Sequence, residues 1–250
     1  MRLARRTALG VLGAALMPVH AQARKLTIAA ASDLRFALDE AMRAFRAVHA
    51  DARIEVVYGS SGKLATQIRH GAPFDVFLSA DREFADALHR DGFAAGAPRL
   101  YARGHLVAWS TDASLGRLPL ADLVRDARVQ RFAIANPEHA PYGRRAVEAL
   151  RSQGQWDAVQ PKLVLGENIA QAVQFVQTGA AQAGLVALSL SLVLAPALAG
   201  KGAYTRVPEA WHSPLEQSMV ITRRAMDNAL AHAFVAHLEV RFFRNYRRFY

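Results

Sequence analysis

Four short stretches of small and hydroxyl residues could together bind an anion. Each stands just before a segment with apolar residues at helical spacing, so each is expected to form a helix N-terminus. The first N–H groups of a helix have no partner within the helix, and the helix dipole places partial positive charge there. Several such termini around one point would hold an anion without lysine or arginine. The stretches are Ala31-Ser32-Asp33, Gly59-Ser60-Ser61-Gly62, Ala140-Pro141-Tyr142-Gly143 and Gly166-Glu167-Asn168-Ile169.

The chain around these stretches alternates between short apolar runs and helical patterns. Apolar runs of four to six residues are typical of buried strands, and they are separated by segments with apolar residues three or four positions apart. The expected strands are 26–30, 54–58, 74–79, 106–109, 131–135, 162–165, 183–187 and 218–222, and the expected helices are 34–49, 64–70, 83–90, 120–125, 143–151, 170–178 and a long one from residue 224.

This alternation predicts an α/β fold with two lobes, each a mostly parallel sheet flanked by helices. Residues 24–104 and 218–250 are expected to form the first lobe and residues 105–217 the second, with two hinge crossings between them. In open parallel sheets, ligands bind beyond the carboxyl ends of the strands, where the helix N-termini also lie. The four stretches, two from each lobe, should therefore face one another across a cleft.

Residues 1–23 have the pattern of an export signal rather than of a folded segment. Three arginines precede an apolar run over 8–17, and Ala21-Gln22-Ala23 offers a small-x-small cleavage site. The alternative, a membrane anchor, needs roughly 18 apolar residues, and Pro18 interrupts this run. We expect cleavage after Ala23 and release into the periplasm.

The rest of the chain is basic and contains no cysteine. Loss of the three signal arginines lowers the formal net charge from +10 to +7. Without cysteine the protein has neither a disulfide nor a lipid-anchored thiol. An exported basic protein rarely meets nucleic acid, so the charge supports a small anionic ligand. We expect a monomer without a nucleic-acid partner.

Seven blocks, in order along the chain, resemble the periplasmic molybdate-binding proteins that feed ATP-driven (ABC) importers. The resemblance implies a type II periplasmic binding protein that captures molybdate or tungstate and passes it to an inner-membrane permease. It also implies that Ser32 and Ser61 supply hydroxyl and backbone N–H groups to the oxyanion, and that Tyr142 and Ile169 supply backbone N–H groups. The blocks are Ala29–Leu34, Tyr58–Gly62, Gly71–Phe77, Asn136-Pro137, Ala140–Gly143, Gly166–Ile169 and Leu185–Ser189.

Two residues are unusual for a molybdate-binding protein, Ala187 because some members of the family have a tyrosine in its block and Asp33 because of its negative charge. Some members carry a ligand-contacting tyrosine in the block where this chain has Ala187, so we expect Tyr142 to take over part of that contact. Asp33 follows Ser32 directly, and a carboxylate there would repel a dianion. We favour a first-turn residue that points away from the site. The alternative is an inward carboxylate that accepts the proton of monohydrogen phosphate.

Secondary site residues are Asp33, Ser60 and Asn168. Asn168 and Glu167 are expected mainly to cap the following helix, because Glu167 carries a further negative charge. No metal-ion ligands or cofactor are expected, since the histidines are scattered and the five-residue spacing of His232 and His237 does not place both on one helix face.

Ser60-Ser61-Gly62-Lys63 also satisfies the Ser-x-x-Lys pattern of penicillin-recognising acyltransferases. That class needs Ser-Asp-Asn and Lys-Thr-Gly as well, but Leu34 follows Ser32-Asp33, and Lys201-Gly202 lacks the threonine. We therefore expect a binding protein rather than an enzyme. A different oxyanion or a small carboxylate is the other alternative, because the same lobes could serve either.

The C-terminal residues 241–250 mix arginines with aromatic side chains. In a cytoplasmic protein this composition would indicate nucleic-acid binding, and export argues against it. We expect a terminal helix that packs its aromatic side chains on the first lobe and leaves its arginines in water.

Overall fold

The computed structural model describes residues 25–190 and 202–245, and the side chains of 241–245 are outside that description. The expected signal segment 1–23 and the side chains of the aromatic C-terminal run therefore lie outside the described residues. Within the described part of the chain, no helix is both long and apolar enough to cross a membrane.

The first sheet has five strands in the order β2-β1-β3-β10-β4. The strands β1, β2 and β3 are parallel, and β10 runs antiparallel to both of its neighbours. Because β10 comes from the far end of the chain, the C-terminal segment returns to the first lobe. Their bounds are β1 Lys25–Ala31, β2 Arg53–Gly59, β3 Val76–Ser79, β4 Arg99–Gly104 and β10 Leu215–Ile221.

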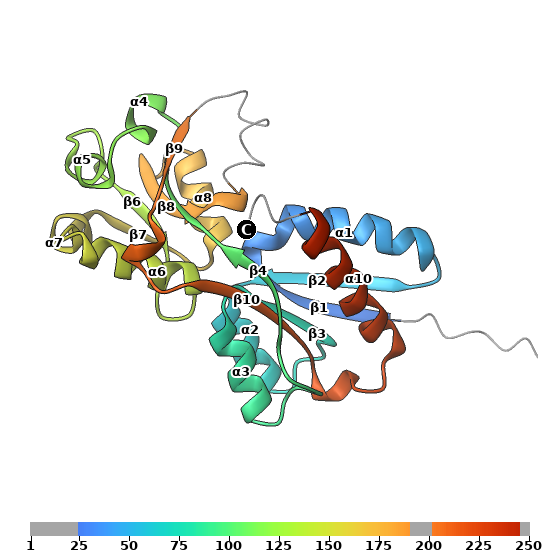
Figure 1. The fold of residues 1–250 in the computed structure, drawn as a ribbon. Helices are drawn as coiled ribbons and strands as arrows, with labels where there is room; N and C mark the ends of the chain where they lie inside the picture. Colours follow the sequence, from blue (N-terminus) through green and yellow to red (C-terminus); the bar gives the residue numbers. More distant parts are fainter. Residues whose placement is uncertain (1–24, 191–201, 246–250) are drawn as a thin grey trace, which may run out of the picture.

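Helices cover both faces of this sheet (Figure 1). On one face, α1 (Arg35–Val48) and α10 (Ala229–Asn245) pack on alternate residues of β1 such as Leu26 and Ile28. On the other, α2 (Ser61–Arg69) and α3 (Arg82–Arg90) pack around Ala29. Successive side chains of a strand point to opposite faces of the sheet. Because helices cover both faces here, β1 carries apolar residues on both, which is why its sequence is mostly apolar.

The second sheet repeats this architecture with the order β7-β6-β8-β5-β9. The strands β6, β7 and β8 are parallel, and β5 is antiparallel to β8 and β9. The strands are β5 Leu106–Ser110, β6 Phe132–Ala135, β7 Leu163–Gly166, β8 Ala183–Ala187 and β9 Ala203–Arg206, and the helices are α4 Ala113–Gly116, α5 Leu120–Arg125, α6 Pro141–Ser152, α7 Trp156–Val159 and α8 Ile169–Gln177.

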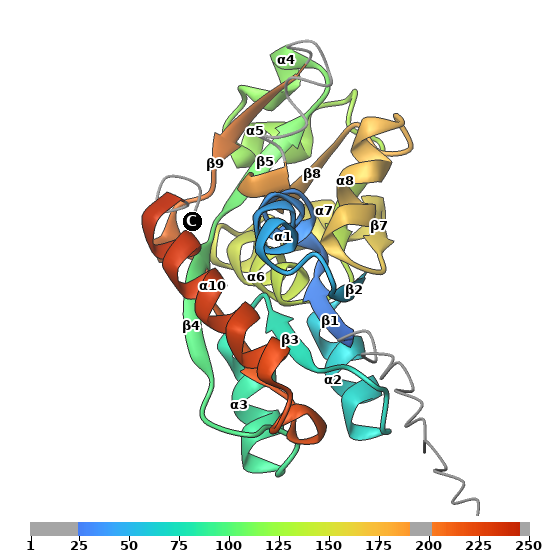
Figure 2. The ribbon, with the colours of Figure 1, turned by 90° about the vertical axis from the view of Figure 1, so that its right-hand side faces the viewer.

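The chain crosses between the two sheets twice. It leaves the first sheet at Gly104, enters the second at Leu106, and returns between Arg206 and Leu215. Figure 2 shows β4 running up from the first lobe towards β5 in the second. Because β4 pairs with β10, the two crossings lie side by side at one edge of the molecule, as a hinge requires.

The prediction of a two-lobed α/β fold is confirmed, with each sheet mixed rather than wholly parallel. The sequence did not reveal β4 or β9. In β4, arginines interrupt the apolar residues and Leu100 is half exposed. In β9, exposed residues alternate with half-buried ones, so no apolar run marks the strand. The strand expected at 218–222 begins earlier, at Leu215. The terminal helix begins later than residue 224, at Ala229, where the Asn228 side chain accepts a hydrogen bond from the Leu230 N–H at 3.0 Å.

Candidate anion-binding site

A small cavity lies between the two lobes, at the carboxyl ends of the central strands. The first lobe contributes residues that follow β1, β2 and β3, and the second contributes the starts of α6 and α8. All four stretches identified in the sequence reach this cavity. Its lining residues are Ala31, Ser32, Asp33, Gly59, Ser60, Ser61, Ala80, Ala140, Pro141, Tyr142 and Ile169.

The first lobe brings three buried serine hydroxyl groups to the cavity, those of Ser32, Ser60 and Ser61. Ser32 opens a short 3₁₀ turn (Ser32–Leu34) before α1, so the first stretch is not itself the start of an α-helix, as had been expected. Its Oγ accepts a hydrogen bond from the Ala170 N–H of the second lobe at 3.3 Å. Ser61 is the first residue of α2, and its Oγ accepts from the Ala80 N–H at 3.0 Å, which ties α2 to the end of β3.

The second lobe brings mainly backbone groups. Ile169 is the first residue of α8 and Tyr142 the second of α6, positions whose N–H groups have no partner inside the helix. Pro141 fits the first position of α6, where its missing N–H is not needed. The helices α2, α6 and α8 thus direct their N-terminal ends at one cavity, where their dipoles favour negative charge.

His139 joins the lobes beside the cavity, a role that the sequence did not indicate. Its carbonyl accepts a hydrogen bond from the Gly62 N–H at 2.9 Å, and its Nδ1 lies 2.9 Å from Ser60 Oγ. Burial, followed by the nearby charge of Lys63, holds the pKa of His139 below its ordinary value. A Cβ at Gly62 would lie 2.7 Å from the His139 carbonyl oxygen, so this close approach requires glycine.

Two exposed ion pairs bridge the lobes at the rim of the cavity. Lys63 Nζ of the first lobe lies 3.1 Å from Glu167 Oε1 of the second. Arg144 Nη1 of the second lobe lies 2.6 Å from Glu83 Oε2 of the first, and its Nη2 also lies 3.5 Å from Oδ2 of the buried Asp81. Glu167 and Glu83 are more than half exposed, so the two exposed pairs are screened by water and contribute little to stability.

The orientation of Asp33 differs from the one that the sequence favoured, in which its side chain pointed away from the site. Its side chain is 1% exposed and does not point out to water. Its Oδ2 accepts hydrogen bonds from Gln217 Nε2 at 2.6 Å and from the Tyr142 hydroxyl at 3.2 Å. Burial raises the pKa of Asp33 to about 6, although both hydrogen bonds act to lower it. The Tyr142 hydroxyl proton, expected to serve the ligand, is therefore directed at Asp33.

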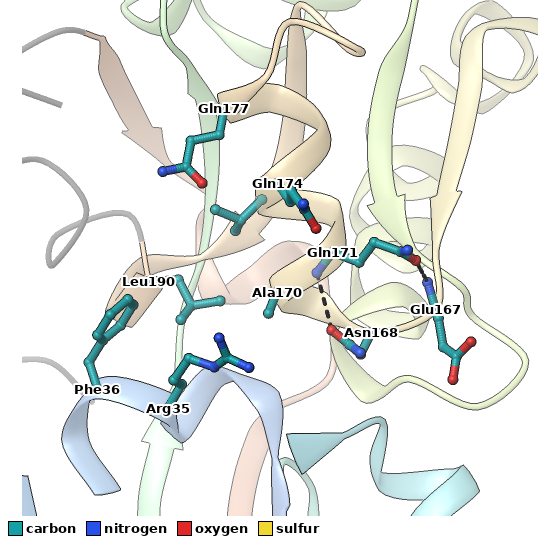
Figure 3. A pocket seen from close by; sticks show the side chains of 10 residues that line it. Arg35, Phe36, Glu167, Asn168, Ala170, Gln171, Gln174, Gln177 and Leu190 are labelled. Atoms are coloured by element: carbon teal, nitrogen blue, oxygen red, sulfur yellow. Dashed lines mark hydrogen bonds between the residues drawn. The ribbon is translucent and has the colours of Figure 1, made fainter. Parts of the chain in front are cut away.

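Asn168 caps α8, as expected, because its side chain accepts a hydrogen bond from the Gln171 N–H at 3.1 Å. It does not line the anion cavity but a separate, more open groove of about 500 Å³ between α1 and α8. Figure 3 shows Arg35 and Phe36 on one side of this groove and the glutamines of α8 on the other. Asn168 therefore supports the start of α8 and is not part of the cavity lining.

The donor set of the cavity suits an oxyanion better than a metal ion. Hydroxyl groups and helix N-termini offer hydrogen bonds to oxygen atoms, whereas metal ions need carboxylate, imidazole or thiolate ligands. In the described part of the chain, no three histidine or acidic side chains are grouped so that they could hold a metal. Lys63, the lysine of the Ser-x-x-Lys pattern, forms an ion pair with Glu167. Ala187, which stands in the block where some family members have a ligand-contacting tyrosine, is not among the residues that line the cavity.

Comparisons with known proteins agree with this fold. The molybdate-binding protein of Azotobacter vinelandii is 36% identical over 229 residues, which cover 91% of this chain and 89% of that protein. That of Rhodobacter capsulatus is 36% identical over 189 residues, covering 74% and 71% respectively. The solved structure of the Azotobacter vinelandii periplasmic protein superimposes with a TM-score of 0.76 and 30% identity, over 86% of this chain and 92% of that one.

Residues 26–240 match the family described as bacterial extracellular solute-binding proteins. The match spans both sheets and both hinge crossings. With two lobes around a cavity and relatives that are similar over most of its length, the chain belongs to the family of bacterial extracellular solute-binding proteins.

Proposed function

We propose that this protein captures molybdate, and tungstate as well, between its two lobes in the periplasm and delivers it to an ABC importer. The observation that carries the proposal is the convergence of Ser32, Ser61, Tyr142 and Ile169 on one cavity between the lobes. The names of the similar proteins, which are molybdate-binding proteins, indicate which oxyanion to test first.

The proposed mechanism is hinge closure without chemistry on the ligand. In an open form, each lobe would offer only half of the donors. An anion that receives hydrogen bonds from both Ser61 and Ile169 binds the closed form more tightly, so it shifts the population towards closure. The contact between Gly62 and His139 and the two rim ion pairs form only when the lobes meet, and they would add to the closed state.

Size is the proposed basis of selectivity against sulfate. Molybdate and tungstate are larger tetrahedra than sulfate, with the same charge and the same need for donors. Backbone N–H groups at helix starts are held rigidly, so a smaller anion would leave some of them unpaired, at roughly 1–3 kcal/mol for each buried donor. Two such losses would give strong discrimination. The same argument predicts little discrimination between molybdate and tungstate.

We further propose that the protein acts as an exported monomer. The amino-terminal pattern over 1–23 supports export. The similar protein of known structure from Azotobacter vinelandii is described as periplasmic. An inner-membrane permease would be its protein partner. The proposal requires no cofactor, no nucleic acid and no enzymatic activity, because capture and release of the anion break no bond in it.

Calorimetric titration of residues 24–250 with molybdate, tungstate, sulfate and phosphate, in separate runs, tests the proposed function. Tight one-to-one binding of the first two, with no heat from the others, is the expected result. Tight binding of sulfate or of a small carboxylate instead would favour the alternative ligand class. Labelling of Ser60 by a fluorescent penicillin would favour the acyltransferase, and we expect none.

A further inference from the structure

Asp33 belongs to a buried cluster that has more hydrogen-bond acceptors than donors. The cluster contains Asp33 of the first lobe, Gln217 of β10 and Tyr142 of α6. All three side chains are at most 2% exposed. Two of their atoms, Asp33 Oδ1 and Gln217 Oε1, have no hydrogen-bond partner among the described residues.

The donors of this cluster are already in use. The Gln217 amide nitrogen donates to Asp33 Oδ2 at 2.6 Å and to the Tyr142 oxygen at 3.3 Å. The Tyr142 hydroxyl carries a single proton, and it donates to Asp33 Oδ2 at 3.2 Å. An ionised carboxylate only accepts, so Asp33 Oδ1 remains a buried acceptor without a donor, which is costly. One added proton on this oxygen would turn it into a donor.

Few charges near Asp33 act to keep it ionised. Tyr142 of α6 is the titratable group that faces its carboxylate, and Gln217 of β10 is neutral. Ser189, which follows β8, donates to the main-chain oxygen of Asp33 at 3.3 Å. Arg35, two residues along the chain, is exposed and lines the outer groove, and His139 contacts Ser60 on the far side of the cavity. The pKa of Asp33 is correspondingly raised by burial.

A dianion in the cavity would add a strong repulsive charge to this environment. Asp33 lines the same cavity as Ser32 and Ser61, so the anion and an ionised carboxylate would share one buried, water-poor site. Like charges in such a site favour the protonated carboxyl group. The hydroxyl groups of Ser32 and Ser61 are neutral and bring no positive charge to offset the repulsion.

We propose that Asp33 takes up one proton from solvent when the oxyanion enters, so that capture of the anion is coupled to proton binding. This inference rests on the proposed function, because it requires a dianion in the cavity. The proton binds to the carboxyl group, no other bond forms or breaks, and the neutral group then has an O–H to donate. A fully deprotonated dianion accepts such a donor.

The coupling fixes the direction of the pH dependence. In the free protein, the pKa of Asp33 is about 6, so the carboxyl group loses its proton near that pH. In the complex it keeps the proton to higher pH. Between these two values the complex holds one more proton than the free protein. The association constant should therefore fall about tenfold for each unit of rising pH in this window and level off at lower pH.

The test is calorimetric titration of the exported protein with molybdate at pH 7.5, in buffers with different enthalpies of ionisation. The dependence of the observed heat on the buffer gives the number of protons taken up. We expect close to one proton per anion for the wild type and close to none for Asp33→Asn, whose affinity should no longer depend on pH. Asp33→Ser replaces it if Asp33→Asn does not fold.

His139→Gln is the matched control, because His139 lies beside the cavity and its imidazole could also gain a proton. Its uptake should remain close to that of the wild type. Tight binding of molybdate without proton uptake would overturn the inference and leave the proposed function intact, as would uptake that persists in Asp33→Asn. Absence of molybdate binding in every buffer would overturn the proposed function and the inference with it, so the two failures are distinguishable.

Discussion

The two halves of the candidate site would recognise an anion by different means. The first lobe presents side chains, namely the hydroxyls of Ser32, Ser60 and Ser61 and the carboxyl group of Asp33. The second lobe presents backbone N–H groups at the starts of α6 and α8, on residues whose side chains are a tyrosine and an isoleucine. A substitution should therefore affect the first half through the side chain it removes, and the second half only if it changes the backbone.

The halves also differ in electrostatic cost. The second lobe adds two helix dipoles and no charged side chain to the lining, whereas the first lobe buries a carboxyl group against its own binding site. A buried carboxylate lowers both the stability of the free protein and its affinity for an anion. The first lobe is thus the half where pH should act.

The largest expected effect is loss of both first-lobe hydroxyls. Ser32→Ala with Ser61→Ala removes two hydrogen-bonding groups and leaves the Ala170 and Ala80 N–H groups without their partners. At roughly 1–3 kcal/mol for each lost group, the affinity for molybdate should fall at least about 30-fold. Calorimetry measures the affinity, and circular dichroism verifies that the variant is folded. Ser110→Ala, a buried serine outside the cavity, should leave affinity unchanged. Unchanged affinity in the double variant would mean that the site is elsewhere.

The second effect is on the stability of the anion-free protein. The pKa of Asp33 is raised from 3.8 to about 6 in the folded state, so between these values the native protein binds more protons than the unfolded chain. The free energy of unfolding should then fall as pH rises through this window, by up to about 3 kcal/mol from this group. Urea denaturation at pH 4 and pH 7 measures the difference.

Asp33→Asn should remove that contribution and stabilise the anion-free protein at pH 7. Asp126→Asn is the control, because Arg128 lowers the pKa of this partly exposed carboxyl group to about 2, which is a shift in the opposite direction. If Asp33→Asn showed the same pH-dependent difference in stability as the wild type, the buried carboxyl group would not be its source.

A proline at residue 169 tests the backbone half. Ile169→Pro removes one N–H donor, and the fold should tolerate it because Ile169 opens α8 and the preceding Asn168 is extended (φ −145°, ψ 175°). Affinity should fall about 10- to 100-fold, as expected for one buried donor. Ile169→Val keeps the N–H and should bind almost like the wild type. Equal losses in the two variants would show that the isoleucine side chain, and not the backbone, matters.

The smallest effect is expected at the rim. Lys63→Gln removes the ion pair with Glu167 of the other lobe, and an exposed pair of this kind contributes at most about 1 kcal/mol, or roughly fivefold in affinity. The loss should shrink in high salt. Arg145→Gln, which breaks a pair with Glu148 inside α6, should leave affinity unchanged. A loss as large as that of the serine variants would assign the rim a main role in closure.

The sequence predicted the convergence of the site because that depends on local signals. Small and hydroxyl residues mark helix starts, and strands of a parallel sheet end at one edge, so Ser61 and Ile169 were placed from the order of elements alone. Tyr142 and its neighbours would not have been singled out without the family resemblance, since Ala140–Gly143 otherwise reads as an ordinary turn. The structure shows this turn as the start of α6.

The environment of Asp33 and the role of His139 could not be predicted, because both depend on distant residues. Gln217, which holds the Asp33 carboxylate inward, is 184 positions away in the sequence, and Ser60 is 79 positions from His139. The local preference of an aspartate for a first helical turn gave the wrong orientation. Tertiary contacts decided it, as they decide the position of β9 at the edge of the second sheet.

The most direct test of a shared site is a crystal of the protein grown with molybdate, measured at the molybdenum absorption edge. We expect one strong anomalous peak between the lobes, with oxygen atoms in hydrogen-bond contact with Ser32 and Ser61 on one side and the N–H groups of Tyr142 and Ile169 on the other. A peak that contacts one lobe alone, or that lies in the open groove between α1 and α8, would contradict this expectation.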